Sequence, residues 1–171
     1  FYNTANGYAA LKANTTGGRN TALGSYALTV SNADNNTAIG TYALSSNTNG
    51  TNNVATGVNA LSSNTDGNYN TATGTNTLYN NTIGIENTAN GYGALFTNQT
   101  GNNNSAYGKY ALFNNNANDN SAYGFNAMFF NASGSSNTAI GTTALQNNTS
   151  GSNNVAVGNY ALGDNITGSN N

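Results

Sequence analysis

The chain has 171 residues, enough for one domain, but it carries only three Lys and Arg, five Asp and Glu and no His, with a formal net charge of −2. Lys12, Arg19 and Lys109 are too few cations to neutralise phosphates, which excludes a nucleic-acid-binding domain. No apolar run approaches the roughly 18 residues needed to cross a bilayer, so we expect no membrane insertion. Leu, Ile, Val and Phe supply 26 residues, about 15% of the chain, so we expect no conventional globular core.

From residue 4 onward the chain is an uninterrupted array of ten similar units. Eight units have 17 residues and two have 16, and they share the pattern [TSV]-A-x-G-x-x-A-L-x-x-N-x-x-G-x-x-N. The two short units lack the Gly at position 14, which marks that loop as the place where length varies. We interpret residues 1–3 as part of a preceding coil and residues 4–171 as one domain, a segment of a longer array. The units are 4–20, 21–36, 37–53, 54–70, 71–87, 88–104, 105–120, 121–137, 138–154 and 155–171.

This period predicts an all-β fold, a parallel β-solenoid with one coil per unit. Helical solenoids need repeats of about 33 residues or more with an apolar stripe at helical spacing, and abundant Gly and Asn disfavour helices. We expect positions 1–3 of each unit to form one strand, position 4 to turn a corner, and positions 7–10 to form a second strand. Ten coils at about 4.8 Å per coil would make a rod roughly 47 Å long.

Two repeat positions are assigned to the corner and the core. The Gly at position 4 requires a backbone conformation that other residues avoid, and the large apolar residue at position 8 is expected to fill the interior. The corner glycines are Gly7, Gly24, Gly40, Gly57, Gly74, Gly91, Gly108, Gly124, Gly141 and Gly158. The core residues are Leu11, Leu28, Leu44, Leu61, Leu78, Leu95, Leu112, Met128, Leu145 and Leu162.

Asn recurs at position 17 of every unit and at position 11 of all but the second, which has Ser31. Stacked coils would place these amides in rows, where each can bond to the coil above and below. The alternative is that Asn simply tolerates left-handed turn conformations. The expected ladder at position 17 comprises Asn20, Asn36, Asn53, Asn70, Asn87, Asn104, Asn120, Asn137 and Asn154.

One Leu and two Ala per coil bury little apolar area, so association with further copies is the expected remedy. Tyr26, Tyr42, Tyr110 and Tyr160 at position 6 are assigned as inter-chain or ligand contacts. Phe96, Phe113 and Phe129 at position 9 are further candidates for inter-chain contacts. The alternative is that these rings remain exposed or shield their own coils.

The N-[ST]-A-x-G core followed by x-x-A-L resembles the head repeats of YadA-like trimeric autotransporter adhesins, most closely at residues 36–40 and 154–158. The longer form is similar to repeat arrays in phage tail-fibre-like proteins. The resemblance covers nearly the whole chain. It implies a left-handed parallel β-roll, a homotrimer and display outside a cell, on a cell surface or on a virion.

Catalytic chemistry is not expected. Without Cys and His the chain lacks thiolate and imidazole groups, and its five acids are scattered over different units. We therefore predict no enzyme activity, no metal site and no cofactor. The expected function is a structural or adhesive extracellular fibre that self-associates and binds carbohydrate or a host or matrix surface. The alternative is an ice-binding solenoid that uses the Thr row at position 1.

Overall fold

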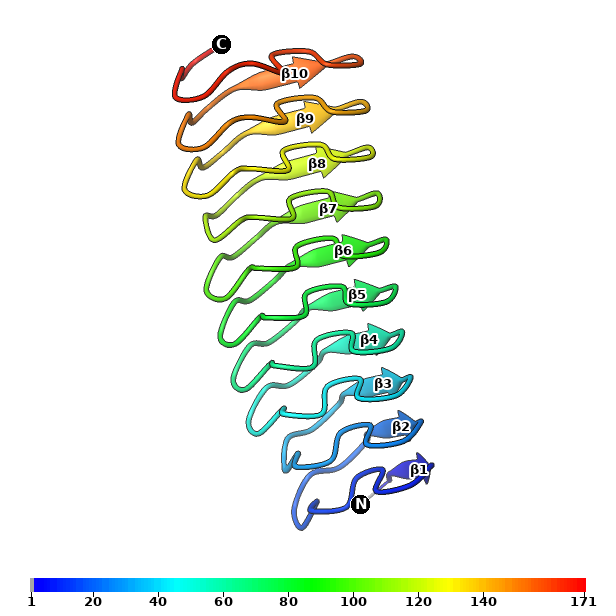
Figure 1. Ribbon diagram of the computed structural model, residues 1–171. Coiled ribbons are helices and arrows are strands. Elements are labelled where there is room, and N and C mark those ends of the chain that lie inside the picture. The colour runs from blue at the N-terminus through cyan, green and yellow to red at the C-terminus, as the bar shows by residue number, and fades with distance from the viewer. Residues whose placement is uncertain (1) are drawn as a thin grey trace.

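The structure, a computed structural model, describes residues 2–171 as a stack of coils that forms a rod, with the two ends of the chain at opposite ends (Figure 1). Its ten strands form one parallel sheet in chain order. This confirms the all-β solenoid and a strand at positions 1–3 of every unit. The strands are β1 (Thr4–Asn6), β2 (Thr21–Leu23), β3 (Thr37–Ile39), β4 (Val54–Thr56), β5 (Thr71–Thr73), β6 (Thr88–Asn90), β7 (Ser105–Tyr107), β8 (Ser121–Tyr123), β9 (Thr138–Ile140) and β10 (Val155–Val157).

The sheet pairs each repeat position with the same position of the next coil. In β3 and β4, for example, Ala38 lies opposite Ala55. Because successive side chains of a strand point to opposite faces, position 2 points inward while positions 1 and 3 point outward. Ala38 is accordingly fully buried, whereas Ile39 is exposed. The small Ala side chain lets the sheet lie close to the opposite side of the coil.

The predicted second strand at positions 7–10 is wrong. The backbone there follows a series of turns, because positions 6 and 8 adopt positive φ, as at Tyr42 (φ 59°) and Leu44 (φ 50°). A chain with these alternating conformations cannot stay extended. The amide of Ala43 bonds back to the Gly40 carbonyl at 3.2 Å, and the amide of Leu44 bonds to Ala60 of the next coil at 3.0 Å. The turns therefore continue the coil-to-coil hydrogen bonding without forming a second sheet.

Two separate constraints, the backbone conformation and the close approach of the next coil, require Gly at the corner. All ten corner glycines have φ between 126° and 146°, a region that side chains rarely adopt. At Gly40 a Cβ atom would also lie 2.4 Å from the carbonyl oxygen of Gly57 in the next coil. A side chain would therefore both strain the backbone and separate the coils.

The position-8 side chains form the apolar column of the interior. The residues from Leu28 to Leu145 in this column are fully buried, including Met128, while Leu11 is 9% exposed. Their left-handed backbone costs roughly 1–2 kcal/mol per residue, and burial of a Leu side chain contributes about 1.5–3 kcal/mol. Leu162, in the last coil, is 36% exposed, because no later coil within residues 2–171 covers it.

In the two short units a side-chain carbonyl accepts the hydrogen bonds that a backbone carbonyl accepts in the full units, and the coil keeps its shape. In the full loops the carbonyl of position 12, such as Thr65, accepts the amides of Thr48, Asn49 and Gly50 from the preceding coil at 2.9–3.1 Å. In the first short unit Oδ1 of Asn32 accepts the Thr15 amide instead at 2.7 Å.

Asn116 takes the same role in the second short unit, accepting the amides of Gln99 and Thr100 at 3.0 and 2.9 Å. Ala33 and Ala117 stand where the other units have the Gly of position 14, and their carbonyls accept the buried amides of Asn20 and Asn104 at 2.8 Å. The loop therefore loses a residue without losing its contacts to the neighbouring coils.

Asn3 makes the contacts of position 17. Its Oδ1 accepts the Asn20 amide at 2.8 Å, and its Nδ2 donates to the Gly17 carbonyl at 2.8 Å. Residue 1, which belongs to the expected preceding coil, lies outside the described residues.

Candidate functional site

The position-17 asparagines form the predicted ladder, and those from Asn20 to Asn154 are buried. The amide of Asn53 donates to Oδ1 of Asn36 at 3.0 Å, and Nδ2 of Asn53 donates to the carbonyl of Gly67 at 2.8 Å. Most bonds of this column thus join a side chain to the main chain of a neighbouring coil. Direct amide-to-amide bonds also occur, as from Asn87 to Asn70 at 3.1 Å.

Position 11 forms a second ladder, in which side-chain amides bond to one another directly. It starts where Asn47 donates to Oγ of Ser31 at 3.3 Å, and it continues through donors that each bond to the Oδ1 of the preceding coil at 2.7–3.3 Å. The successive donors are Asn64, Asn81, Asn98, Asn115, Asn131, Asn148 and Asn165.

The alternative explanation for Asn at positions 11 and 17 was that Asn tolerates a left-handed backbone. That conformation occurs at position 16. Asn35, Asn52, Asn103 and Asn153 there have φ between 57° and 61°. Asn therefore serves two purposes in the coils that carry it at position 16, whereas residues such as Tyr69 and Glu86 make the same turn in other coils. Asn supplies amides to the interior columns and tolerates a turn on the surface.

The aromatic side chains stack along the rod axis within the single chain. Tyr79, Phe96, Phe113 and Phe129 at position 9 form one stack, with centroids 5.0–5.1 Å apart and interplanar angles of 2–6°. Tyr110 packs edge-on against Phe113 at 5.2 Å. These rings shield their own coils, as the local alternative expected, and contact with a second chain stays a prediction.

The other predicted tyrosine contacts occupy two separate places. Tyr26 and Tyr42 stack at 5.0 Å near the first coils, and partial burial, followed by the charges of its neighbours Tyr8 and Tyr42, raises the pKa of Tyr26. Near the last coil the Tyr160 hydroxyl donates to Oδ1 of Asp164 at 2.5 Å, and this bond raises the pKa of Tyr160. The four position-6 tyrosines therefore do not form one site.

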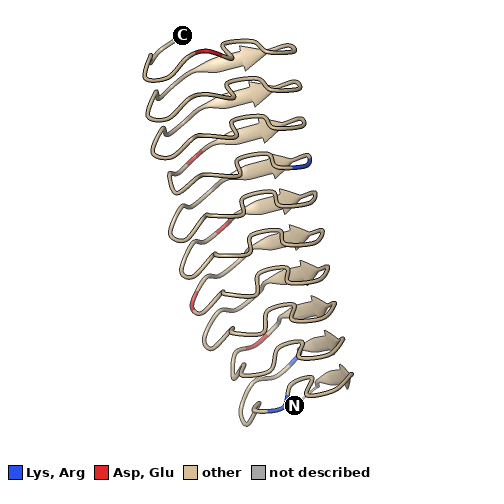
Figure 2. Ribbon diagram, in the orientation of Figure 1, with Lys and Arg blue, Asp and Glu red and all other residues tan. Residues whose placement is uncertain are grey.

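Charged side chains are isolated along the rod (Figure 2). Asp34, Asp66, Glu86 and Asp119 follow the position-12 turn of four different coils, and Asp164 lies at position 10 of the last coil. Nδ2 of Asn49 donates to Oδ1 of Asp66 at 2.7 Å, which lowers the pKa of that carboxyl. Within residues 2–171 no three His, Cys, Asp or Glu side chains come together as a metal site would require.

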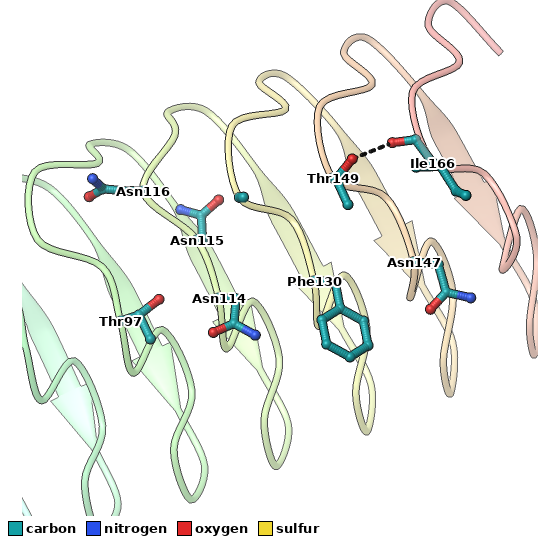
Figure 3. A pocket seen from close by; sticks show the side chains of 9 residues that line it. Thr97, Asn114, Asn115, Asn116, Phe130, Asn147, Thr149 and Ile166 are labelled. Atoms are coloured by element: carbon teal, nitrogen blue, oxygen red, sulfur yellow. Dashed lines mark hydrogen bonds between the residues drawn. The ribbon is translucent and has the colours of Figure 1, made fainter.

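An open groove of about 680 Å³, which the sequence analysis missed, runs along the rod from the sixth to the tenth coil. Its lining consists of an outer row at position 10 and an inner row at positions 11 and 12 (Figure 3). Figure 3 shows Asn114, Phe130 and Asn147 side by side in the outer row. The lining residues are Thr97, Asn114, Asn115, Asn116, Phe130, Ala132, Asn147, Thr149 and Ile166.

Two departures from the repeat coincide at this groove. The unit 105–120 is short by one loop residue, and the next unit has Ala132 at position 12, where five other units have Thr. The other short unit is followed by Thr48 at position 12. A short loop followed by Ala at position 12 is thus the sequence signal that could have located the groove.

No helix within the described residues is long and apolar enough to cross a membrane. Comparison of the chain with protein-family models, with curated proteins and with solved structures finds no match in any of the three.

Proposed function

We propose that this chain is a structural and adhesive segment of an extracellular fibre and not an enzyme. The observation that carries the proposal is the regular rod, in which ten coils present equivalent surface positions at one axial interval. Repetition of weak contacts produces avidity without a single strong site. The scattered charges leave most of the surface neutral, which favours attachment through hydrogen bonds and apolar contacts.

Association of three copies, with the rods side by side, belongs to the same proposal. It is supported by the exposed apolar side chains on the sheet face, including Ile39, Ile140 and Val157. These residues occupy position 3, in one outward row along the sheet. A second chain packed on this row would remove apolar surface from water, with a gain of about 25 cal/mol per Å².

The test combines sedimentation of the whole chain with an attachment assay. We expect a trimeric mass, rods by electron microscopy, and adhesion of protein-coated beads to at least one of immobilised mucin, collagen, cellulose and chitin. Albumin-coated beads are the control. A monomer whose beads attach to none of these surfaces would contradict the proposal.

One observation favours ice binding as a second candidate. Position 1 points outward from the sheet in register, so that Thr4, Thr21 and Thr37 form a row, as do Thr71 and Thr88. Val54 and Val155 interrupt the row, and the neighbouring position-3 row includes the stacked rings of Tyr107 and Tyr123. Thermal hysteresis with ice shaping at micromolar protein would favour this candidate over the fibre.

A further inference from the structure

The groove that runs from the sixth to the tenth coil breaks the uniformity of the rod. It spans four coil intervals, about 19 Å at the usual strand spacing. Asn115 and Ala132 belong to the inner row of its lining. It is therefore a long depression made by the short seventh unit and the small side chain of Ala132.

The lining combines one aromatic ring with amides and hydroxyls. Phe130 is 44% exposed, and Asn114 and Asn147 flank it in the outer row (Figure 3). Neither of these two amides bonds to another residue of the lining, whereas Thr149 donates to the Ile166 carbonyl at 3.0 Å. The ring thus lies between two amides that have both donors and acceptors to offer.

We propose that this groove binds an extended, neutral oligosaccharide. An aromatic face packs against the C–H face of a pyranose ring, and amides on either side can both donate to and accept from the hydroxyl groups of neighbouring sugar residues. The coil interval of about 4.8 Å is close to the length of one pyranose unit in an extended β-linked chain. Successive coils therefore offer one contact per sugar residue.

The absence of charge in the lining selects against other ligands. None of the nine lining residues is charged, so sulfated or carboxylated glycans would find no Arg or Lys partner there. An extended peptide is also disfavoured, because strand addition needs a free sheet edge. The groove lies across coils whose amides already bond to neighbouring coils, as Asn114 does to Phe129 at 3.0 Å.

This inference rests on the fibre proposal, since it names the class of surface to which the fibre attaches, but it is tested separately. The probes are soluble cellohexaose, chitohexaose and mannohexaose, titrated to millimolar concentration against the whole chain by calorimetry, with a heparin hexasaccharide as the charged comparison. We expect at least one neutral probe to bind and the heparin fragment not to bind.

Two variants alter the groove and one does not. Ala132→Thr places in the depression the residue that five other units have at that position, and Phe130→Ala removes the ring. Each is expected to weaken binding about tenfold or more, which corresponds to about 1.4 kcal/mol per tenfold. Phe125→Ala, on the same coil and 45% exposed, is the matched control and should bind like the unmodified chain. Equal circular dichroism spectra and melting temperatures would show that all three variants fold.

Three outcomes would overturn the groove assignment: no neutral probe binds, only the heparin fragment binds, or both groove variants bind like the unmodified chain. The attachment assay keeps the two proposals distinct. If Ala132→Thr beads still attach as well as unmodified beads, the groove is wrong and the adhesive fibre stands. If the soluble sugar binds but no beads attach, the groove stands and the adhesive fibre is wrong.

Discussion

Nδ2 of Asn64 donates to Oδ1 of Asn47 in the preceding coil at 2.7 Å, and both side chains are fully buried. The same Nδ2 also donates to the Gly67 carbonyl at 3.0 Å, and Oδ1 of Asn64 accepts from Asn81 at 2.8 Å. Each amide of this column from Asn47 to Asn148 therefore uses both hydrogens and its oxygen. Because a buried polar group is costly only when it lacks partners, the rod can fill much of its interior with amides.

The position-17 ladder makes a charge at Asn87 costly. Nδ2 of Asn87 donates to the Gly101 carbonyl at 2.8 Å and to Oδ1 of Asn70 at 3.1 Å. Asn87→Asp would remove these donors and set a carboxylate against two acceptors. We expect a loss of about 3–5 kcal/mol in the free energy of unfolding at neutral pH, measured by urea denaturation.

Asn102→Asp is the matched control. Oδ1 of Asn102 accepts the Ile85 amide at 2.8 Å, and the natural Asp34 accepts the Gly18 amide at 2.7 Å from the same repeat position. A carboxylate is therefore compatible with this site, and the change should stay within about 0.5 kcal/mol. Equal losses for the two variants would reject the idea that the ladder is sensitive to charge.

The apolar column predicts unequal effects for two Leu→Ala changes. Leu61 is fully buried between Leu44 and Leu78, so Leu61→Ala should cost about 2–5 kcal/mol by leaving a cavity. Leu162→Ala removes a side chain that is already 36% exposed and should cost much less. Melting temperatures of the two variants provide the comparison. A larger effect at Leu162 would show that the last coil is covered in solution.

Thr143 offers a stabilising substitution. This β-branched residue sits at position 6 with φ 55°, where Asn is better tolerated. Asn126 stands at the same position one coil earlier. Thr143→Asn should relieve the strain and supply an Oδ1 that accepts from Nδ2 of Asn126, as Oδ1 of Asn76 accepts from Nδ2 of Asn59 in the preceding coil at 3.0 Å. We expect a gain of about 1 kcal/mol.

The control for this gain is Thr143→Ala, which removes β-branching without supplying an amide. If that variant is as stable as Thr143→Asn, relief of strain alone accounts for the gain. A loss of stability in Thr143→Asn would contradict the prediction.

The hydrogen bond between Asn49 and Asp66 predicts that stability depends on pH under acidic conditions. The bond from Asn49 lowers the pKa of Asp66 in the folded state. The contribution of the ionised Asp66 carboxylate to stability is therefore present above the pKa that Asp66 has in the unfolded chain, and it is lost as the pH falls through the pKa of the folded state. Nuclear magnetic resonance titration should give a midpoint below the ordinary aspartate value. Asn49→Ala should move that midpoint upward. An unchanged midpoint would show that Asn49 does not control the carboxyl.

The repeat pattern alone determined the fold class, the coil boundaries and the strand at positions 1–3. It could do so because stacked coils place every unit in the same environment, and each environment then selects the same residue type. The corner position, for example, has the same conformation from Gly7 to Gly158. The buried amides at positions 11 and 17 followed from the same reasoning.

Tertiary structure decided what depends on conformation and on contacts between coils. The Ala-Leu pair at positions 7 and 8 favoured a strand. In the structure Leu44 has a left-handed φ, and its side chain is fully buried against the neighbouring coils. The free energy gained by that burial is not part of local backbone propensity. The groove likewise arose from a short unit and the following Ala132 acting together. A repeat consensus averages such departures away, and the stacking of neighbouring coils places the two departures on one surface.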